Sequence, residues 1–174
     1  VKLQTELAKL GFAANDIQNA TPAILDLAAS LEVDLADAAV LAGSTVRAFG
    51  LTTNDTQMVV DLLATSTSSS ALNFSSLTES LKYVAPAARG ANVPIDEAVV
   101  LLAALADNGI KGSQAGTGLS KVFLELAIKG LTLEEAISKV NKSQEGLVTA
   151  SEIVGVKAGK ALLALAGTPK DKLD

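Results

Sequence analysis

The sequence has neither cysteine nor histidine among its 174 residues. These absences exclude thiol nucleophiles, Ser-His and Cys-His catalytic pairs, thiolate or imidazole metal sites and a disulfide framework. They also leave no side chain that titrates near neutral pH at its ordinary pKa. Any catalysis would therefore depend on paired carboxylates.

Aromatic residues are almost as scarce, and positive charge is not concentrated anywhere. Alanine, leucine and valine supply most of the 49% of residues that are hydrophobic, and aromatic residues make up only 3%. Small apolar residues with few rings favour close helix packing over a β-sandwich. A net charge of −5 without a basic stripe disfavours binding to nucleic acid.

Long hydrophobic segments are also missing. The longest uninterrupted apolar run, Ala98–Ala106, has 9 residues, whereas a bilayer-spanning helix needs roughly 20. This run therefore predicts a buried helix and no membrane span. The chain shows no signal-peptide pattern and begins at Val1 without methionine, inside an expected helix. We therefore expect a fragment of a much longer chain.

What is present is a helical period, with no sustained alternation of period two. The stripe Leu119, Val122, Phe123 and Leu126 lies on one helix face. We predict an all-α fold, a compact bundle of about nine or ten short helices without a sheet. The expected helices span residues 1–10, 14–20, 22–31, 35–49, 53–65, 76–89, 95–108, 114–129, 133–141 and 150–166. They form a single helical domain, 1–174, with a possible subdivision at an exposed Ser/Thr linker, 65–70.

Helix starts can be placed from capping residues. Thr21-Pro22 is typical of a cap followed by proline at the first helical position. Ser76–Glu79, Thr132–Glu135 and Thr149–Glu152 match the capping box. Pro86 falls inside an expected helix and predicts a kink.

One short pattern recurs: an apolar residue, a cap-like residue and then acids before alanine. It occurs as Val33–Ala38, Val93–Ala98 and Leu131–Ala136. The pattern is explained either by the preference of acids for helix starts or by internal duplication. Spacings of about 60 and 38 residues are too unequal for a solenoid repeat.

The glycine-rich segment Asn108–Leu119 is the most informative part of the sequence. A phosphate-binding P-loop needs its lysine after the last glycine, followed by Ser or Thr. Here Lys111 comes too early, and Gly118 is followed by leucine. We instead predict a connector in which Gly109 ends one helix and Ser113 caps the next.

No catalytic constellation emerges from the remaining residues. The acidic pairs Asp96–Glu97 and Glu134–Glu135 are sequence neighbours at expected helix starts, so their members point to different helix faces. A sugar-cleaving pair would also need an aromatic cleft. Gly155–Gly159 has the small-xxx-small spacing of close helix contacts. We predict no catalytic residues, no cofactor-binding residues and no metal ligands.

Several segments together resemble the core region of phage tail tape measure proteins, over about residues 7–125. The segments are Ala23–Ala29, Ala48–Leu51, Ser80–Pro86 and Leu105–Thr117, with a similar glycine-containing turn at Val154–Gly159. The string Gly-Ile-Lys-Gly-Ser-Gln-Ala-Gly-Thr is the specific part. Pro94 and Gly118 depart from the expected pattern, and each weakens a helix start locally.

The resemblance implies a structural virion component of a phage or prophage, made in the bacterial cytoplasm. Such a protein fills the tail tube, sets its length and leaves as DNA is ejected. The implied partners are tube subunits, assembly chaperones and further copies of the chain, with no cofactor and no enzymatic activity.

Two other interpretations remain open. An all-helical interaction or adaptor domain would bind a partner helix in an apolar groove, and an enzyme would need a carboxylate site. A flanking chain of many hundred residues with coiled-coil heptads favours the tail protein, and a short parent protein favours the adaptor.

Overall fold

The computed structural model describes residues 2–173. In this range the chain forms ten α-helices and two short 3₁₀ helices, and no strand occurs. The all-α prediction is confirmed. The chain divides into two compact units, of which the first ends at Ser69 and the second begins at Ser70.

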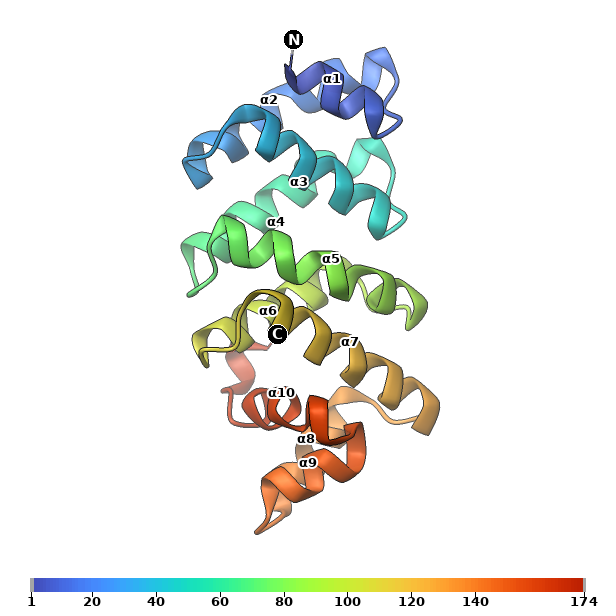
Figure 1. Cartoon of the computed structure of the whole chain (residues 1–174), viewed down its shortest axis with the longest axis vertical. Helices are drawn as coiled ribbons and strands as arrows, with labels where there is room; N and C mark the ends of the chain where they lie inside the picture. Colours follow the sequence, from blue (N-terminus) through green and yellow to red (C-terminus); the bar gives the residue numbers. More distant parts are fainter. Residues whose placement is uncertain (1, 174) are drawn as a thin grey trace. The chain divides into compact units, whose positions relative to one another are not determined.

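In the first unit, helices that are two apart in the chain lie side by side (Figure 1). α1 packs on α3, and α2 packs on both α3 and α4. The core is aliphatic and includes the fully buried side chains of Leu7, Ile24, Leu27, Leu41 and Leu63. The helices of this unit are α1 (Lys2–Lys9), α2 (Ala14–Leu31), α3 (Leu35–Ala48), η1 (Thr53–Asp55) and α4 (Thr56–Ser68).

A glycine lets α1 and α3 approach closely. A Cβ on Gly43 would lie 2.6 Å from Cδ1 of Leu10 and 3.2 Å from Cδ2 of Leu7. Four residues further along α3, the Arg47 guanidinium donates a hydrogen bond to the Leu10 carbonyl oxygen. The end of α1 is therefore fixed both by packing and by a side-chain cap.

In the second unit, α5 lies along α7, α7 packs on α10, and α10 packs on α8 and α9 (Figure 1). Its core is again dominated by leucine, with Leu77, Leu102, Leu105, Leu119, Leu162 and Leu165 fully buried. The helices of this unit are α5 (Phe74–Gly90), α6 (Ile95–Asp107), α7 (Gly112–Lys129), α8 (Leu133–Lys142), α9 (Gly146–Val154), α10 (Val156–Ala166) and η2 (Lys170–Lys172).

Six helices end in the same way. A residue with φ between 54° and 85° stands after the last turn, at Gly11, Glu32, Gly50, Asn92, Gly109 and Gly130. The apolar residue that follows donates its backbone N–H to the carbonyl five residues earlier, at 2.8–3.1 Å. This is the Schellman motif, which satisfies carbonyls that a helix end would otherwise leave unpaired.

The helices α2 and α5 are built alike. Their first residues, their stops and the first residues of the next helices are each 60 positions apart: Ala14 and Phe74, Glu32 and Asn92, Leu35 and Ile95. The recurring acidic pattern thus marks helix starts, as expected. At the starts of α3 and α6, the pattern follows two helices, α2 and α5, whose starts and stops also match at the same 60-residue offset.

The prediction that Thr21-Pro22 starts a helix is wrong. α2 runs without interruption from Ala14 to Leu31 and contains Pro22. The Thr21 hydroxyl donates to the Ile17 carbonyl oxygen at 2.5 Å. Proline removes one backbone hydrogen bond, but Ile24 and Leu27 on the following turn are fully buried, and this burial holds the helix together.

Only one of the three predicted capping boxes starts a helix. Thr132 and Glu135 cap α8 reciprocally, at 2.9 and 3.2 Å. α5 begins earlier than expected, because Asn73 accepts from the Ser76 N–H at 2.9 Å and asparagine is among the best cap residues. Thr149 lies inside α9, where its hydroxyl donates to Oγ of Ser143 at 2.7 Å.

The Ser/Thr run 65–70 is mostly helical and is not an exposed linker, but the boundary between the two compact units falls within it, between Ser69 and Ser70. α4 continues through Ser68, and Ser66 is buried. The Ser68 and Ser69 hydroxyls donate to the Thr65 carbonyl oxygen at 2.9 and 2.7 Å. Hydroxyls that bond back to the preceding turn are compatible with a helix, so a polar run alone does not mark a linker.

The expected helix 150–166 is two helices. Gly155, with φ of 81°, separates α9 from α10. The close contact predicted from the glycine spacing is present at Gly159, where a Cβ would lie 2.4 Å from Oγ of Ser151. The first glycine of the motif thus reverses the chain, and the second lets the two helices meet.

The helix stops generate a stability prediction. An added Cβ would meet nothing within 4 Å at either Gly130 or Gly90, but only Gly130 has a positive φ. We expect Gly130→Ala to lower the free energy of unfolding by about 1 kcal/mol. Gly90→Ala, at the end of α5, should raise it by up to about 1 kcal/mol. Urea unfolding of both variants measures this, and equal stabilities would contradict a conformational role for Gly130.

The α8 cap predicts a pH dependence. Hydrogen bonds from the backbone and the hydroxyl of Thr132 hold the pKa of Glu135 below its usual 4.5. A carboxyl group whose pKa is lowered by folding stabilises the protein above its unfolded pKa, and this contribution is lost as pH falls through the folded pKa. Wild type should exceed Glu135→Gln in melting temperature at pH 7, with the gap closing below pH 4.5. The neighbouring Glu134→Gln is the control, and a gap independent of pH would refute the cap.

Candidate interaction surface

The glycine-rich segment forms a helix junction. Gly109 ends α6 with φ of 81°, and the Ile110 N–H donates to the Leu105 carbonyl oxygen at 2.9 Å. The predicted stop is therefore confirmed, but the predicted cap is wrong. α7 begins at Gly112, directly after Lys111, and Ser113 already lies in its first turn.

The segment continues as a close contact between α5 and α7. A Cβ on Gly116 would lie 2.4 Å from the Ser80 carbonyl oxygen. The fully buried Ser80 hydroxyl lies 2.7 Å from the Ser76 carbonyl oxygen and 2.9 Å from that of Gly112. Its single proton is thus shared between two helices. We call the contact of Ser80 with Gly112 and Gly116 the glycine seam.

Each glycine of the segment has a structural reason. Gly109 and Gly112 take positive φ values of 81° and 58°. Gly116 admits the α5 backbone, and a Cβ on Gly118 would lie 3.1 Å from Cβ of Ala161 on α10. This packing supports the connector interpretation over a ligand-binding loop.

The acidic pairs lie at helix starts, as the sequence indicated. Asp96 and Glu97 are in the first turn of α6, and Glu134 and Glu135 are in the first turn of α8. The structure adds a feature that sequence spacing could not show. Asp96, Glu97 and Glu134 line one groove between the two helices.

This α6–α8 groove has a volume of about 520 Å³. Its lining is mixed, with carboxylates from both helix starts and aliphatic side chains. The lining residues are Pro94, Asp96, Glu97, Val100, Leu101, Leu133, Glu134, Ile137, Lys170 and Leu173. A second hollow of about 250 Å³ shares Glu97 and Leu133 with it and reaches Phe123 and Leu126 of α7.

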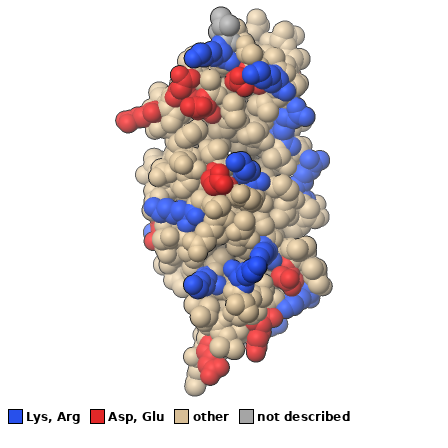
Figure 2. Space-filling view, in the orientation of Figure 1, with Lys and Arg blue, Asp and Glu red and all other residues tan. Residues whose placement is uncertain are grey.

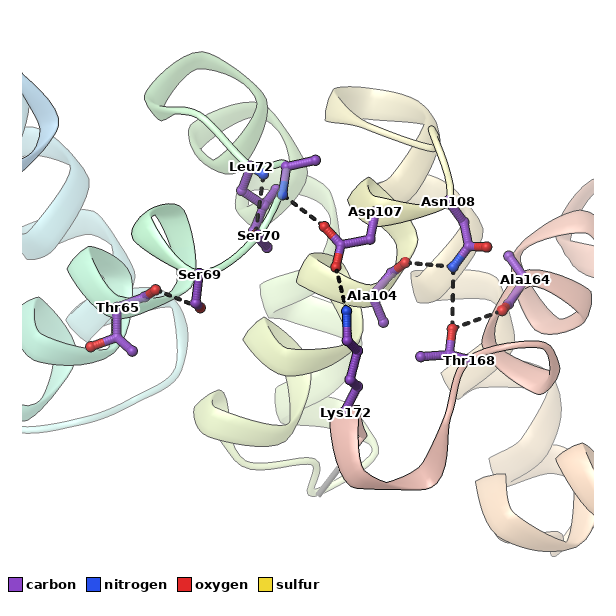
Figure 3. A network of polar contacts seen from close by, with 11 residues as sticks. Thr65, Ser69, Ser70, Leu72, Ala104, Asp107, Asn108, Ala164, Thr168 and Lys172 are labelled. Atoms are coloured by element: carbon purple, nitrogen blue, oxygen red, sulfur yellow. Dashed lines mark hydrogen bonds and ion pairs between the residues drawn. The ribbon is translucent and has the colours of Figure 1, made fainter.

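The chain after α10 lies against the groove and the end of α6. Lys172 pairs with Asp107 at 3.6 Å, and the other oxygen of Asp107 accepts from the Ala71 N–H at 2.7 Å. Asn108 donates to the Thr168 hydroxyl at 3.2 Å (Figure 3). These contacts join the end of α6 to the segment before α5 and to the segment after α10.

The face in Figure 2 carries both positive and negative side chains. Among residues 2–173, no cluster of three or more acidic side chains is placed to hold a metal ion. No helix in the described part of the chain combines the length and hydrophobicity needed to cross a membrane.

Comparison with known proteins identifies the family. Residues 1–168 match the family described as phage-related minor tail protein. The chain belongs to this family. The resemblance found in the glycine-rich string and its neighbouring helices is thereby confirmed.

Two curated relatives of this minor tail protein chain are similar over most of its length. It is 35% identical over 150 residues to the "Tape measure protein" of Pneumococcus phage Dp-1, covering 86% of the chain and 12% of that protein. It is 32% identical over 147 residues to the "Probable tape measure protein" of Escherichia phage P2, covering 79% and 18%. The chain thus spans less than a fifth of either relative. No solved structure matches it.

The glycine seam gives this minor tail protein chain a testable packing constraint. Glycine-to-alanine changes inside helices usually stabilise by about 1 kcal/mol. At Gly116 we expect the opposite sign, a loss of about 3 kcal/mol or more, because the Cβ would press on Ser80 backbone. The neighbouring Thr117→Ala is the control and should change stability by less than about 0.5 kcal/mol. Urea unfolding measures the stability of both variants. A Gly116→Ala variant more stable than wild type would show that α5 and α7 do not touch at this position.

Proposed function

We propose that this chain is a structural segment of a phage tail tape measure protein. It acts in tail assembly and in tail-length determination, and it is released from the tube during DNA ejection. The observation that carries the proposal is the identity of 35% and 32% to two proteins named as tape measure proteins, over most of this chain. The role is that of a structural protein, and the acidic pairs act at helix starts.

Length measurement and folding make opposite demands on the segment. One continuous helix of 174 residues would extend about 260 Å at 1.5 Å per residue. The folded segment instead interrupts its helices, six times with a Schellman stop. We infer that it is made as a folded helical module and opens at these stops when other tail proteins cover its apolar faces.

The surface supports such partners. Leu124 and Ile128, four residues apart on α7, are 56% and 69% exposed, and Val156 at the start of α10 is 82% exposed. Tube subunits, assembly chaperones or another copy of the chain would cover these residues. The same faces fit the adaptor interpretation, which differs in lacking a role in tail length.

Tail length tests the proposal directly. Removing the segment in frame from its parent gene should shorten tails by up to about 260 Å if the segment opens fully in the tube. An in-frame duplication should lengthen them by a similar amount, and electron microscopy measures both. The duplication keeps the test valid if the deletion blocks assembly. Tails of unchanged length with the duplicated segment present in virions would exclude the ruler role.

A further inference from the structure

We propose that the α6–α8 groove binds a short basic amphipathic helix from a partner protein. The partner inserts a leucine-sized side chain between α6 and α8 and places lysine or arginine on the acidic rim. Only the source of that helix, another tail protein, rests on the proposed function.

The floor of the groove suits an aliphatic side chain. The aliphatic lining residues are Val100 and Leu101 of α6, Leu133 and Ile137 of α8, and Leu173. Leu101 is buried, whereas Val100, Leu133 and Ile137 keep part of their surface exposed. Covering this remaining apolar surface favours binding.

The rim determines the charge of the partner. It carries the carboxylates of Asp96, Glu97 and Glu134 and a single ammonium group, that of Lys170. The two helix N-termini at α6 and α8 each add roughly half a positive charge, and the rim remains net negative. A basic segment is therefore attracted and an acidic one is repelled.

The chain itself supplies an example of this chemistry. The segment 169–173, here called the C-terminal strap, places Lys170 and Leu173 on the groove. Lys170 pairs with Glu134 at 3.5 Å, but both side chains are more than 80% exposed. An exposed pair contributes little stability, so a longer segment with the same lysine and leucine chemistry can replace the strap.

The probe is a fluorescent 18-residue amphipathic peptide of leucine and lysine, and its matched control replaces lysine with glutamate. Each peptide is titrated with the 174-residue chain at physiological salt. Fluorescence anisotropy should show that the basic peptide binds at least tenfold more tightly than the glutamate control. Methyl NMR shifts should concentrate on Val100 and Ile137. Equal binding of both peptides, or shifts outside the groove, would overturn the proposal.

Matched variants locate the site. Glu97→Gln with Glu134→Gln should weaken binding of the basic peptide about tenfold, which corresponds to 1.4 kcal/mol. The control pair Glu145→Gln with Glu152→Gln makes the same change in net charge on exposed residues outside the groove and should bind like wild type. Leu173→Ala should bind more tightly, because it loosens a competing strap. Equal weakening by both pairs would indicate general charge attraction and refute the site.

A second copy of the chain is the competing occupant. If the free chain dimerises and its groove methyls shift with protein concentration, the groove is a self-association surface and the proposal fails. The peptide assay uses the purified chain, whereas tail length is measured in virions. Either proposal can therefore fail without the other.

Discussion

The fold depends on how its helices end. At each Schellman stop, a residue with positive φ turns the chain, and the next residue seals the last turn with a backbone hydrogen bond while its apolar side chain returns to the helix. This geometry fixes the direction in which the next helix leaves. Because four of the six stops are glycines and the others are Glu32 and Asn92, most cost little conformational strain.

Close packing is the second constraint, and it follows from the first. Short helices bury little area each, so the interior relies on near contact between backbones. A Cβ on Gly116 would lie 2.4 Å from the Ser80 carbonyl oxygen of α5, and a Cβ on Gly159 would lie 3.1 Å from the Ser151 backbone of α9. Serine hydroxyls at such contacts, as at Ser80, satisfy backbone carbonyls across the seam. The alanine- and glycine-rich composition is therefore a packing requirement in this fold.

Sequence reasoning predicted the helical class, most helix positions, the stop at Gly109 and the cap at Thr132, because these depend on local chemistry. It failed where tertiary burial overrides local signals: Pro22 is tolerated inside a buried helix, and Asn73 caps α5 ahead of a plausible box. The α6–α8 groove was out of reach for another reason. Its carboxylates, at Asp96 and Glu134, are 38 positions apart and meet only through packing.

If the folded segment opens in the tail tube, as we propose, its helix stops must be stable in the folded state and yet cost little free energy to open. A Schellman stop is a backbone arrangement with one longer-range hydrogen bond, and extending the helix through it replaces that bond with ordinary helical ones. Glycine at the joint has no strong preference between the two states, although it is a poor residue in a helix interior. The larger barrier is the loss of core burial, which only a partner surface can offset. Opening is therefore expected to depend on partners taking over the apolar faces, with glycine deciding where the chain bends.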